Sequence, residues 1–184
     1  MKKESVFLRA LDMGDLERVL KWHNDAALYE TLGGTYRPVN RANEAAWLRR
    51  KCVFSTSEVN LAICVAGTGA HVGNLYLRNI DPTARHGEVH LFLGDRPNRS
   101  KGYGSSALRQ LVRLAFATLG LQRLYLYVLA DNAAAIRTYA KCGFAVEGRL
   151  RRQAFKQGRF KDMLVMGLCR TEGTKARRHR GTKK

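Results

Sequence analysis

A glycine-containing turn at residues 99–104 (Arg-Ser-Lys-Gly-Tyr-Gly) carries the groups that bind a phosphate ester. Glycines at 102 and 104 let the backbone approach an anion without a Cβ in the way. The following segment has a helical pattern, and the unpaired N–H groups and dipole of its first turn favour negative charge. The turn lacks the Gly-Lys-Ser/Thr ending of a P-loop and is not a complete Gly-x-Gly-x-x-Gly. By itself it predicts an anion site without identifying the anion.

His86, Glu88 and His90 precede this turn at intervals of two residues. A regular β-strand places such residues on one face, unless a bulge interrupts the strand. A carboxylate and an imidazole are groups that accept protons in general acid–base catalysis. The alternative is a polar strand face without a catalytic role. We expect no metal here, because strand neighbours spaced by two rarely converge on one ion.

The surrounding patterns alternate between strands and helices. Apolar alternation and buried runs predict strands at 6–11, 59–66, 72–80, 87–93, 124–129, 145–153 and 160–169. Apolar residues at helical spacing predict helices starting near 12–15 and running over 43–53, 103–118 and 132–142, with Asn43 as a capping residue. We therefore expect one α/β domain with a mixed sheet over residues 1–169.

Two segments resemble the GNAT superfamily of N-acetyltransferases. Residues 99–104 match its Arg/Gln-x-x-Gly-x-Gly/Ala signature, and residues 132–148 resemble its Asn-x-x-Ala-x-x-x-Tyr-x-x-x-Gly-Phe-x-x-x-Gly stretch. The opening Leu-Arg-Ala-Leu (8–11) and the Gly-Arg-x-x-Asp of 158–162 are similar to the ribosomal-protein-alanine and spermidine N-acetyltransferases. The resemblance covers about residues 5–169. It implies the GNAT acyl-CoA N-acyltransferase fold, a mixed and mostly antiparallel sheet flanked by helices, and direct transfer from acetyl-CoA to a primary amine in a ternary complex, without a metal.

The resemblance also implies roles for individual residues. Backbone groups of Leu91, Phe92 and Leu93 would bind the pantetheine arm, and Asn132 would contact the CoA arm or support the turn. The pyrophosphate would be bound by Arg99, Ser100, Lys101, Gly102, Tyr103, Gly104, Ser105 and Ser106. Tyr139 would protonate the leaving thiolate, with core packing as its alternative. Glu88 matches a glutamate of many relatives and is the first candidate to accept the proton of the amine. His90 is the second, because the pKa of histidine lies closer to neutral pH.

The acceptor pocket is expected between the first two helices and their loop. Candidates are Trp22, His23, Asn24, Tyr29, Tyr36 and Glu88, with Trp47 as a further one and helix packing as the alternative for the two tryptophans. The loop at 32–38 is neutral to basic, which disfavours a cationic polyamine. Small amines rank first: an amino sugar, a nucleotide-linked sugar or an aminoglycoside-like antibiotic. A protein N-terminus and an aminoacyl-tRNA follow, and a non-catalytic acyl-CoA- or RNA-binding module is the alternative of a different class.

Charge and composition add expectations about partners. The net charge is +18, and residues 170–184 hold seven Lys/Arg and one acidic residue. This segment has no apolar periodicity, so we expect a disordered basic tail that could contact RNA or the ribosome. No run of 18 apolar residues or signal peptide is evident, which predicts a cytoplasmic protein that does not cross a membrane. Four scattered cysteines predict free thiols, and a homodimer is a further expectation.

Overall fold

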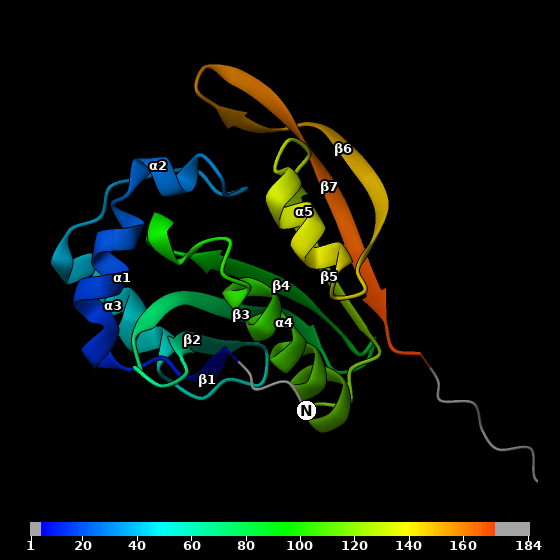
Figure 1. Ribbon diagram of the computed structural model, residues 1–184, viewed down its shortest axis with the longest axis horizontal. Helices are drawn as coiled ribbons and strands as arrows, with labels where there is room; N and C mark the ends of the chain where they lie inside the picture. Colours follow the sequence, from blue (N-terminus) through cyan, green and yellow to red (C-terminus); the bar gives the residue numbers. More distant parts are fainter. Residues whose placement is uncertain (1–4, 172–184) are drawn as a thin grey trace, which may run out of the picture.

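The computed structural model describes residues 5–171 and contains one seven-stranded sheet in the order β1-β2-β3-β4-β5-β7-β6 (Figure 1). The strands are β1 (Val6–Ala10), β2 (Val59–Val65), β3 (His71–Asp81), β4 (His86–Leu93), β5 (Arg123–Leu129), β6 (Ala145–Lys156) and β7 (Arg159–Cys169). All neighbouring pairs are antiparallel except β4 and β5. The mixed, mostly antiparallel sheet confirms the expected fold class.

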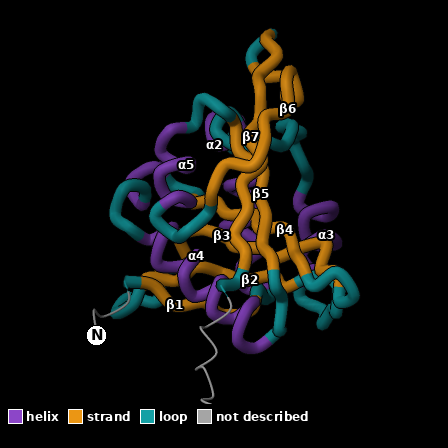
Figure 2. Tube along the Cα trace, turned by 90° about the vertical axis from the view of Figure 1, so that its right-hand side faces the viewer, coloured by secondary structure: helices purple, strands orange, loops and turns teal. Residues whose placement is uncertain are grey.

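Helices cover both faces of this sheet, as Figure 2 shows. They are α1 (Leu16–His23), α2 (Ala26–Tyr29), α3 (Arg41–Lys51), α4 (Tyr103–Arg113) and α5 (Ala133–Ala140), with a π-helical turn at Leu114–Thr118. The α4 and α5 side encloses the larger apolar core, which includes Leu75, Leu108 and Leu126. The α1 and α3 side holds a smaller cluster around Leu48 and Tyr76. The alternation of β3 and β4 therefore sends one set of side chains toward each group of helices.

Strands β4 and β5 separate after a short parallel contact. Their register pairs His86 with Arg123, Gly87 with Leu124 and Glu88 with Tyr125, and no pair follows among the described residues. Strand β4 continues for five more residues to Leu93, and β5 for four more to Leu129. The sheet consequently opens between these strands, beside the predicted site residues Glu88 and His90.

Two helix starts differ from expectation. Helix α3 begins at Arg41 because the side chain of Asn40, not Asn43, accepts the capping hydrogen bond, from the Asn43 N–H at 2.8 Å. Helix α2 was not predicted, since four residues are too few to show a helical period. Asp25 caps it by accepting from the backbone of the helix. The first helical segment was expected, and the capping box at Asp12 marks its start.

The predicted basic tail, 170–184, lies outside the described residues except for its first two positions. Residues 5–171 contain no helix long and apolar enough to cross a bilayer. The four cysteines are free thiols, as expected; Cys64 is buried, whereas Cys52 and Cys169 are exposed.

Candidate active site

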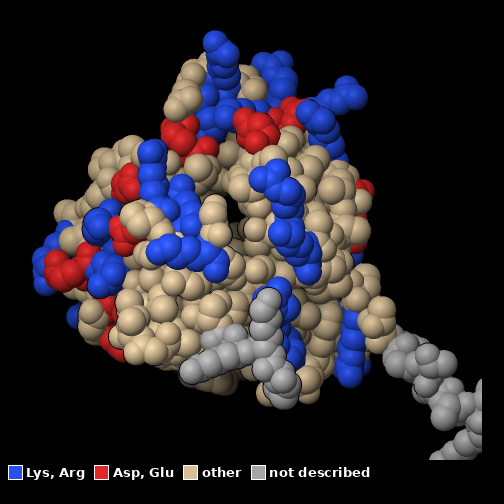
Figure 3. Space-filling view, viewed as in Figure 1, with Lys and Arg blue, Asp and Glu red and all other residues tan. Residues whose placement is uncertain are grey.

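A cavity of about 1110 Å³ occupies the opening between β4 and β5 and continues toward α1–α3. Figure 3 shows the hollow from one side, with Lys and Arg side chains around it. Among its lining residues are Arg99, Arg137 and Lys141. A volume of this size accommodates a large cofactor together with a second reactant.

The predicted phosphate turn lies along this cavity. Gly102 precedes α4 with φ 81°, in the left-handed region that glycine adopts without strain. The first helical hydrogen bond of this turn runs from the Ser106 N–H to the Gly102 carbonyl at 3.0 Å. The preceding amides therefore have no acceptor within the helix and are available to an anion.

The turn residues differ in their exposure to the cavity. Six of them line the cavity: Arg99, Ser100, Gly102, Tyr103, Gly104 and Ser105. Lys101 is exposed outside the lining, and Ser106 is buried within α4. A direct phosphate contact by these last two side chains is thus not supported by their positions.

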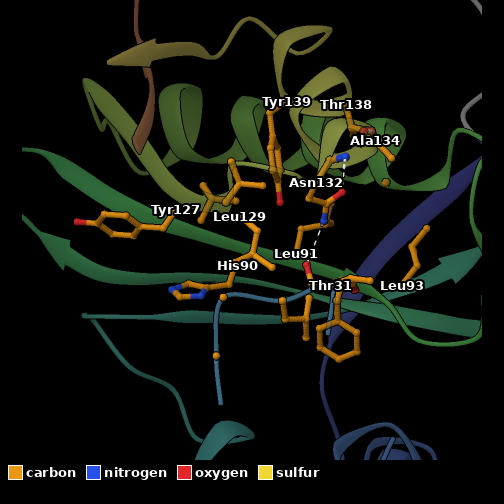
Figure 4. Close-up of a pocket in the computed structure, with 18 of the residues that line it drawn as sticks. Thr31, His90, Leu91, Leu93, Tyr127, Leu129, Asn132, Ala134, Thr138 and Tyr139 are labelled. Carbon is orange, nitrogen blue, oxygen red and sulfur yellow. Dashed lines mark hydrogen bonds between the residues drawn. The ribbon is translucent and has the colours of Figure 1, made fainter. Parts of the chain in front are cut away.

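Tyr139 descends from α5 with its hydroxyl directed toward Leu91 of β4 (Figure 4). Burial raises the pKa of Tyr139 to about 12, so its hydroxyl stays protonated at neutral pH. Asn132 caps α5 by accepting from the Ala135 N–H at 3.1 Å. Its Nδ2 donates to the carbonyl of Thr31 at 3.0 Å, which joins α5 to the segment after α2 across the cavity.

Glu88 and His90 lie on the same face of β4, as their spacing predicted. The register between β3 and β4 shifts only between Arg78 and Asp81. The pairing is regular from Glu88 to Leu93, so side chains alternate between the two faces along this part of β4. The Nε2 atom of His90 is 2.9 Å from Oε1 of Glu88, and Asn79 Nδ2 donates to Oε2 at 2.8 Å. Burial lowers the pKa of His90, and the Glu88 carboxylate opposes this shift. At neutral pH the His90 ring is therefore mainly uncharged and can accept a proton.

The expected acceptor residues divide into lining and supporting groups. Tyr29 lines the cavity and stacks edge-on with Tyr36, whereas Tyr36 lies outside the lining. The side chain of Asn24 bonds to both backbone groups of Val39, at 2.9 Å each, and so secures the loop before α3. Its position is that of a structural residue and not of a cavity contact.

Trp22 is 1% exposed and belongs to the core, so its expected place in the acceptor pocket was wrong. Its indole packs against Phe92 and directly over Gly94, where an added Cβ would overlap the ring. This close approach needs glycine at the end of β4. Trp22 thereby supports the start of the phosphate turn.

The lining also includes His23 and Trp47, which the sequence placed with the first two helices, and Tyr76 and Arg78, which the sequence did not single out. Tyr76 and Arg78 stand opposite His90 and Glu88 in the β3–β4 register, which brings them to the same face. The alternation of β3 predicts that Tyr76 and Arg78 share a face of the strand. That this face is also the face of Glu88 and His90 follows only from the register between β3 and β4. The name acceptor wall is used below for His23, Tyr29, Trp47, Tyr76, Arg78, Glu88 and His90.

Lys156 fixes one rim of the acceptor wall. This lysine on β6 is 5% exposed, and its Nζ donates to the carbonyls of Tyr29, at 2.8 Å, and Gly34. Burial lowers the pKa of Lys156, while the nearby Glu30 carboxylate opposes the shift. The lysine joins the segment after α2 to the β6–β7 hairpin, although the two are far apart in the sequence.

The comparison with family models gives one decisive match. Residues 5–145 match the acetyltransferase (GNAT) domain. The chain belongs to the GNAT acetyltransferase family. It is therefore an acetyl-CoA-dependent N-acetyltransferase. Within residues 5–171, no group of three His, Cys, Asp or Glu side chains is placed to hold a metal ion.

Relatives of this GNAT chain match over nearly its whole length. An uncharacterized N-acetyltransferase, YokL, of Bacillus subtilis is 33% identical and covers 92% of each chain. The spermidine N(1)-acetyltransferase of Escherichia coli is 29% identical, covering 88% of this chain and 84% of the relative. A crystal structure of the Vibrio cholerae spermidine N-acetyltransferase with CoA and spermine superposes with a TM-score of 0.81 at 24% identity, covering 91% and 96% of the two chains. This last likeness confirms the fold.

Proposed function

We propose that this GNAT enzyme acetylates a small primary amine, with Glu88 and His90 as its proton-accepting pair and Tyr139 as its proton donor. One observation carries the proposal. Glu88 and His90 extend from β4, the Tyr139 hydroxyl is directed toward the same strand from α5, and all three line one cavity together with the phosphate turn. Holding two reactants between such groups removes much of the entropic barrier to transfer.

The residues present fit acetyl-CoA, which supplies the acetyl group as a thioester. The amides before Ser106, together with Arg99, would hold its pyrophosphate. Strand β4 from Leu91 to Leu93 has no β5 partner in its register and would bind the pantetheine arm through backbone groups. Asn132 would shape the entrance through its bond to Thr31.

The proton transfers follow from the positions of the side chains. A primary amine with a pKa near 10 arrives mostly protonated, so the Glu88–His90 pair would take its proton before attack. As the new C–N bond forms and the C–S bond breaks, the Tyr139 hydroxyl would protonate the departing sulfur. Its raised pKa keeps that proton on the oxygen until it is needed.

A polyamine acceptor is the second candidate, because named relatives act on spermidine. The aromatic residues of the acceptor wall and the nearly buried Glu44, whose Oε1 lies 2.9 Å from His23 Nδ1, are compatible with a cation. The exposed loop after α2 carries Arg37 and no acidic residue between 31 and 38, which opposes one. We therefore rank a small non-polyamine acceptor first.

The test is a panel of amines incubated with acetyl-CoA while free CoA thiol is followed. It should contain amino sugars, nucleotide-linked amino sugars, aminoglycosides, peptides with free N-termini and spermidine. We expect thiol release that depends on enzyme and on an amine. Acetylation of spermidine alone would establish the second candidate. If none of the amines in the panel causes thiol release, the proposal is refuted.

A further inference from the structure

Arg78 presents a positive charge to the cavity, and no carboxylate of residues 5–171 pairs with it. It lines the cavity from β3, directly opposite Glu88 in the register. Among residues 5–171 no carboxylate lies within ion-pair distance of its guanidinium, and its buried Nε has no hydrogen-bond partner. An unpaired polar group of this kind raises the free energy of the folded protein unless a ligand satisfies it.

The neighbouring acids are already engaged. Glu88 bonds to Asn79 at 2.8 Å and lies 2.9 Å from His90. Glu58, whose charge also acts near Arg78, receives a bond from Lys51 at 2.5 Å. Within residues 5–171, both of these carboxylates are therefore already bound to other side chains.

A buried network holds Arg78 in this position. Its Cζ lies 4.6 Å from the centre of the Tyr76 ring, a cation–π contact. The Tyr76 hydroxyl accepts from Asn74 Nδ2 at 2.8 Å, and Asn74 Oδ1 is 2.7 Å from His71 Nε2. His71 Nδ1 is in turn 2.9 Å from Asp15 Oδ1. All four supporting side chains are at most 5% exposed, so the aromatic platform under the guanidinium is fixed in advance.

We propose that Arg78 determines acceptor specificity by binding an anionic group, a carboxylate or a phosphate, that the amine acceptor carries. This inference rests on the proposed function and names its substrate class. Guanidinium groups bind both anions through paired, charge-assisted hydrogen bonds. Arg78 stands on the acceptor wall next to Glu88, so the amine and the anionic group of one small molecule reach Glu88 and Arg78 together. A polyamine meets repulsion at the same place.

The experiment compares matched amines that differ only in the anionic group. Glucosamine 6-phosphate is paired with glucosamine, and L-methionine with L-methioninamide, to separate phosphate from carboxylate; spermidine is added. In the native enzyme we expect kcat/KM for the anionic member of at least one pair to exceed that of its partner by about tenfold or more. Arg78→Gln should bring this ratio to about one by lowering only the anionic member.

Two variants and one binding measurement make the result specific. Arg78→Lys keeps the charge without the planar fork and should restore part of the preference. Arg50→Gln removes the same charge from an exposed position on α3 and should leave the ratio unchanged. The acetyl-CoA affinity should stay within about twofold in all variants, since Arg78 lies away from the phosphate turn.

The failures are distinguishable. Equal or better turnover of the amines without an anionic group, or of spermidine, by the native enzyme would overturn the role of Arg78 while leaving acetyl transfer intact. A preference that survives in Arg78→Gln would do the same. If acetyl-CoA binds but no CoA thiol is released with any amine of the panel, the proposed function itself fails and this inference fails with it.

Discussion

The Nε2 atom of His90 lies 2.9 Å from Oε1 of Glu88, so the two candidate proton acceptors form one pair. The two side chains that the sequence offered as alternatives are therefore in direct contact. Either side chain can receive the proton of the amine while the other stabilises the charge that results. The pair is held by Asn79 on the side away from His90.

Replacement of Glu88 by Gln should lower kcat by about a hundredfold or more between pH 6 and 9, because it removes the carboxylate that we propose as the proton acceptor. His90→Gln should have a smaller effect. The measurement is the pH profile of thiol release for both variants with the preferred amine.

The same pH profiles show whether His90, and not Glu88, accepts the proton of the amine. Burial holds the pKa of His90 below its usual value, and Glu88 raises it in part. A histidine base is active above its pKa, so the acid limb of kcat/KM lies below pH 6.5. Without Glu88 that pKa falls further, and the acid limb moves to lower pH with activity retained at neutral pH. Such a shift would assign the base to His90.

Replacement of Tyr139 by Phe should reduce kcat by about a hundredfold and leave acetyl-CoA affinity within about twofold. The ring packing against Phe144 is kept, and only the hydroxyl is lost. Single-turnover acetyl transfer and titration of acetyl-CoA binding test this. Loss of binding with unchanged chemistry would make Tyr139 a packing residue.

Replacement of Gly94 by Ala should destabilise the protein by about 1–3 kcal/mol, since the new methyl group would overlap the Trp22 ring. Acetyl-CoA affinity should fall as well, because the displaced strand end leads into the phosphate turn. Denaturant unfolding with and without acetyl-CoA measures both effects. Gly148→Ala is the matched control, because no atom lies within 4 Å of its added Cβ. Equal losses in both variants would contradict the role given to Trp22.

Replacement of Lys156 by Met should raise the KM of the amine by about tenfold and leave acetyl-CoA affinity unchanged. The loss of two hydrogen bonds to backbone carbonyls frees the segment from Tyr29 to Gly34, which borders the acceptor wall. Steady-state kinetics with each reactant varied in turn provides the test. Arg151→Met, at an exposed position of the same strand, is the control, and similar kinetics in the two variants would refute the tether.

Local patterns predicted most of the fold. Period-two and helical spacing located all seven strands and the longer helices, since burial of one face imposes these periods directly. The capping residue of α3 was misplaced because Asn40 and Asn43 are chemically equivalent candidates three residues apart. Helix α2 left no periodic signal, and Asp25 was its one clue.

The candidate site was predictable where its residues are close in sequence. Glu88, His90 and the phosphate turn lie within one strand–turn–helix segment, and the motif around Tyr139 follows. Trp22 was misassigned because its burial depends on Gly94, more than seventy residues away. Arg78 reaches the cavity through strand register, and Lys156 reaches the segment at its rim through a hairpin. No local pattern encodes either arrangement.

The early end of the β4–β5 pairing has a geometric consequence. Three residue pairs, the last of them Glu88 with Tyr125, join the β1–β4 part of the sheet to the β5–β7 part. Glu88 belongs to the last of these pairs, whereas Tyr139 lies on the helix that follows β5. The separation between Glu88 and Tyr139 therefore depends on how far the two strands diverge beyond the third pair, and the bond from Asn132 to the Thr31 carbonyl spans that divergence.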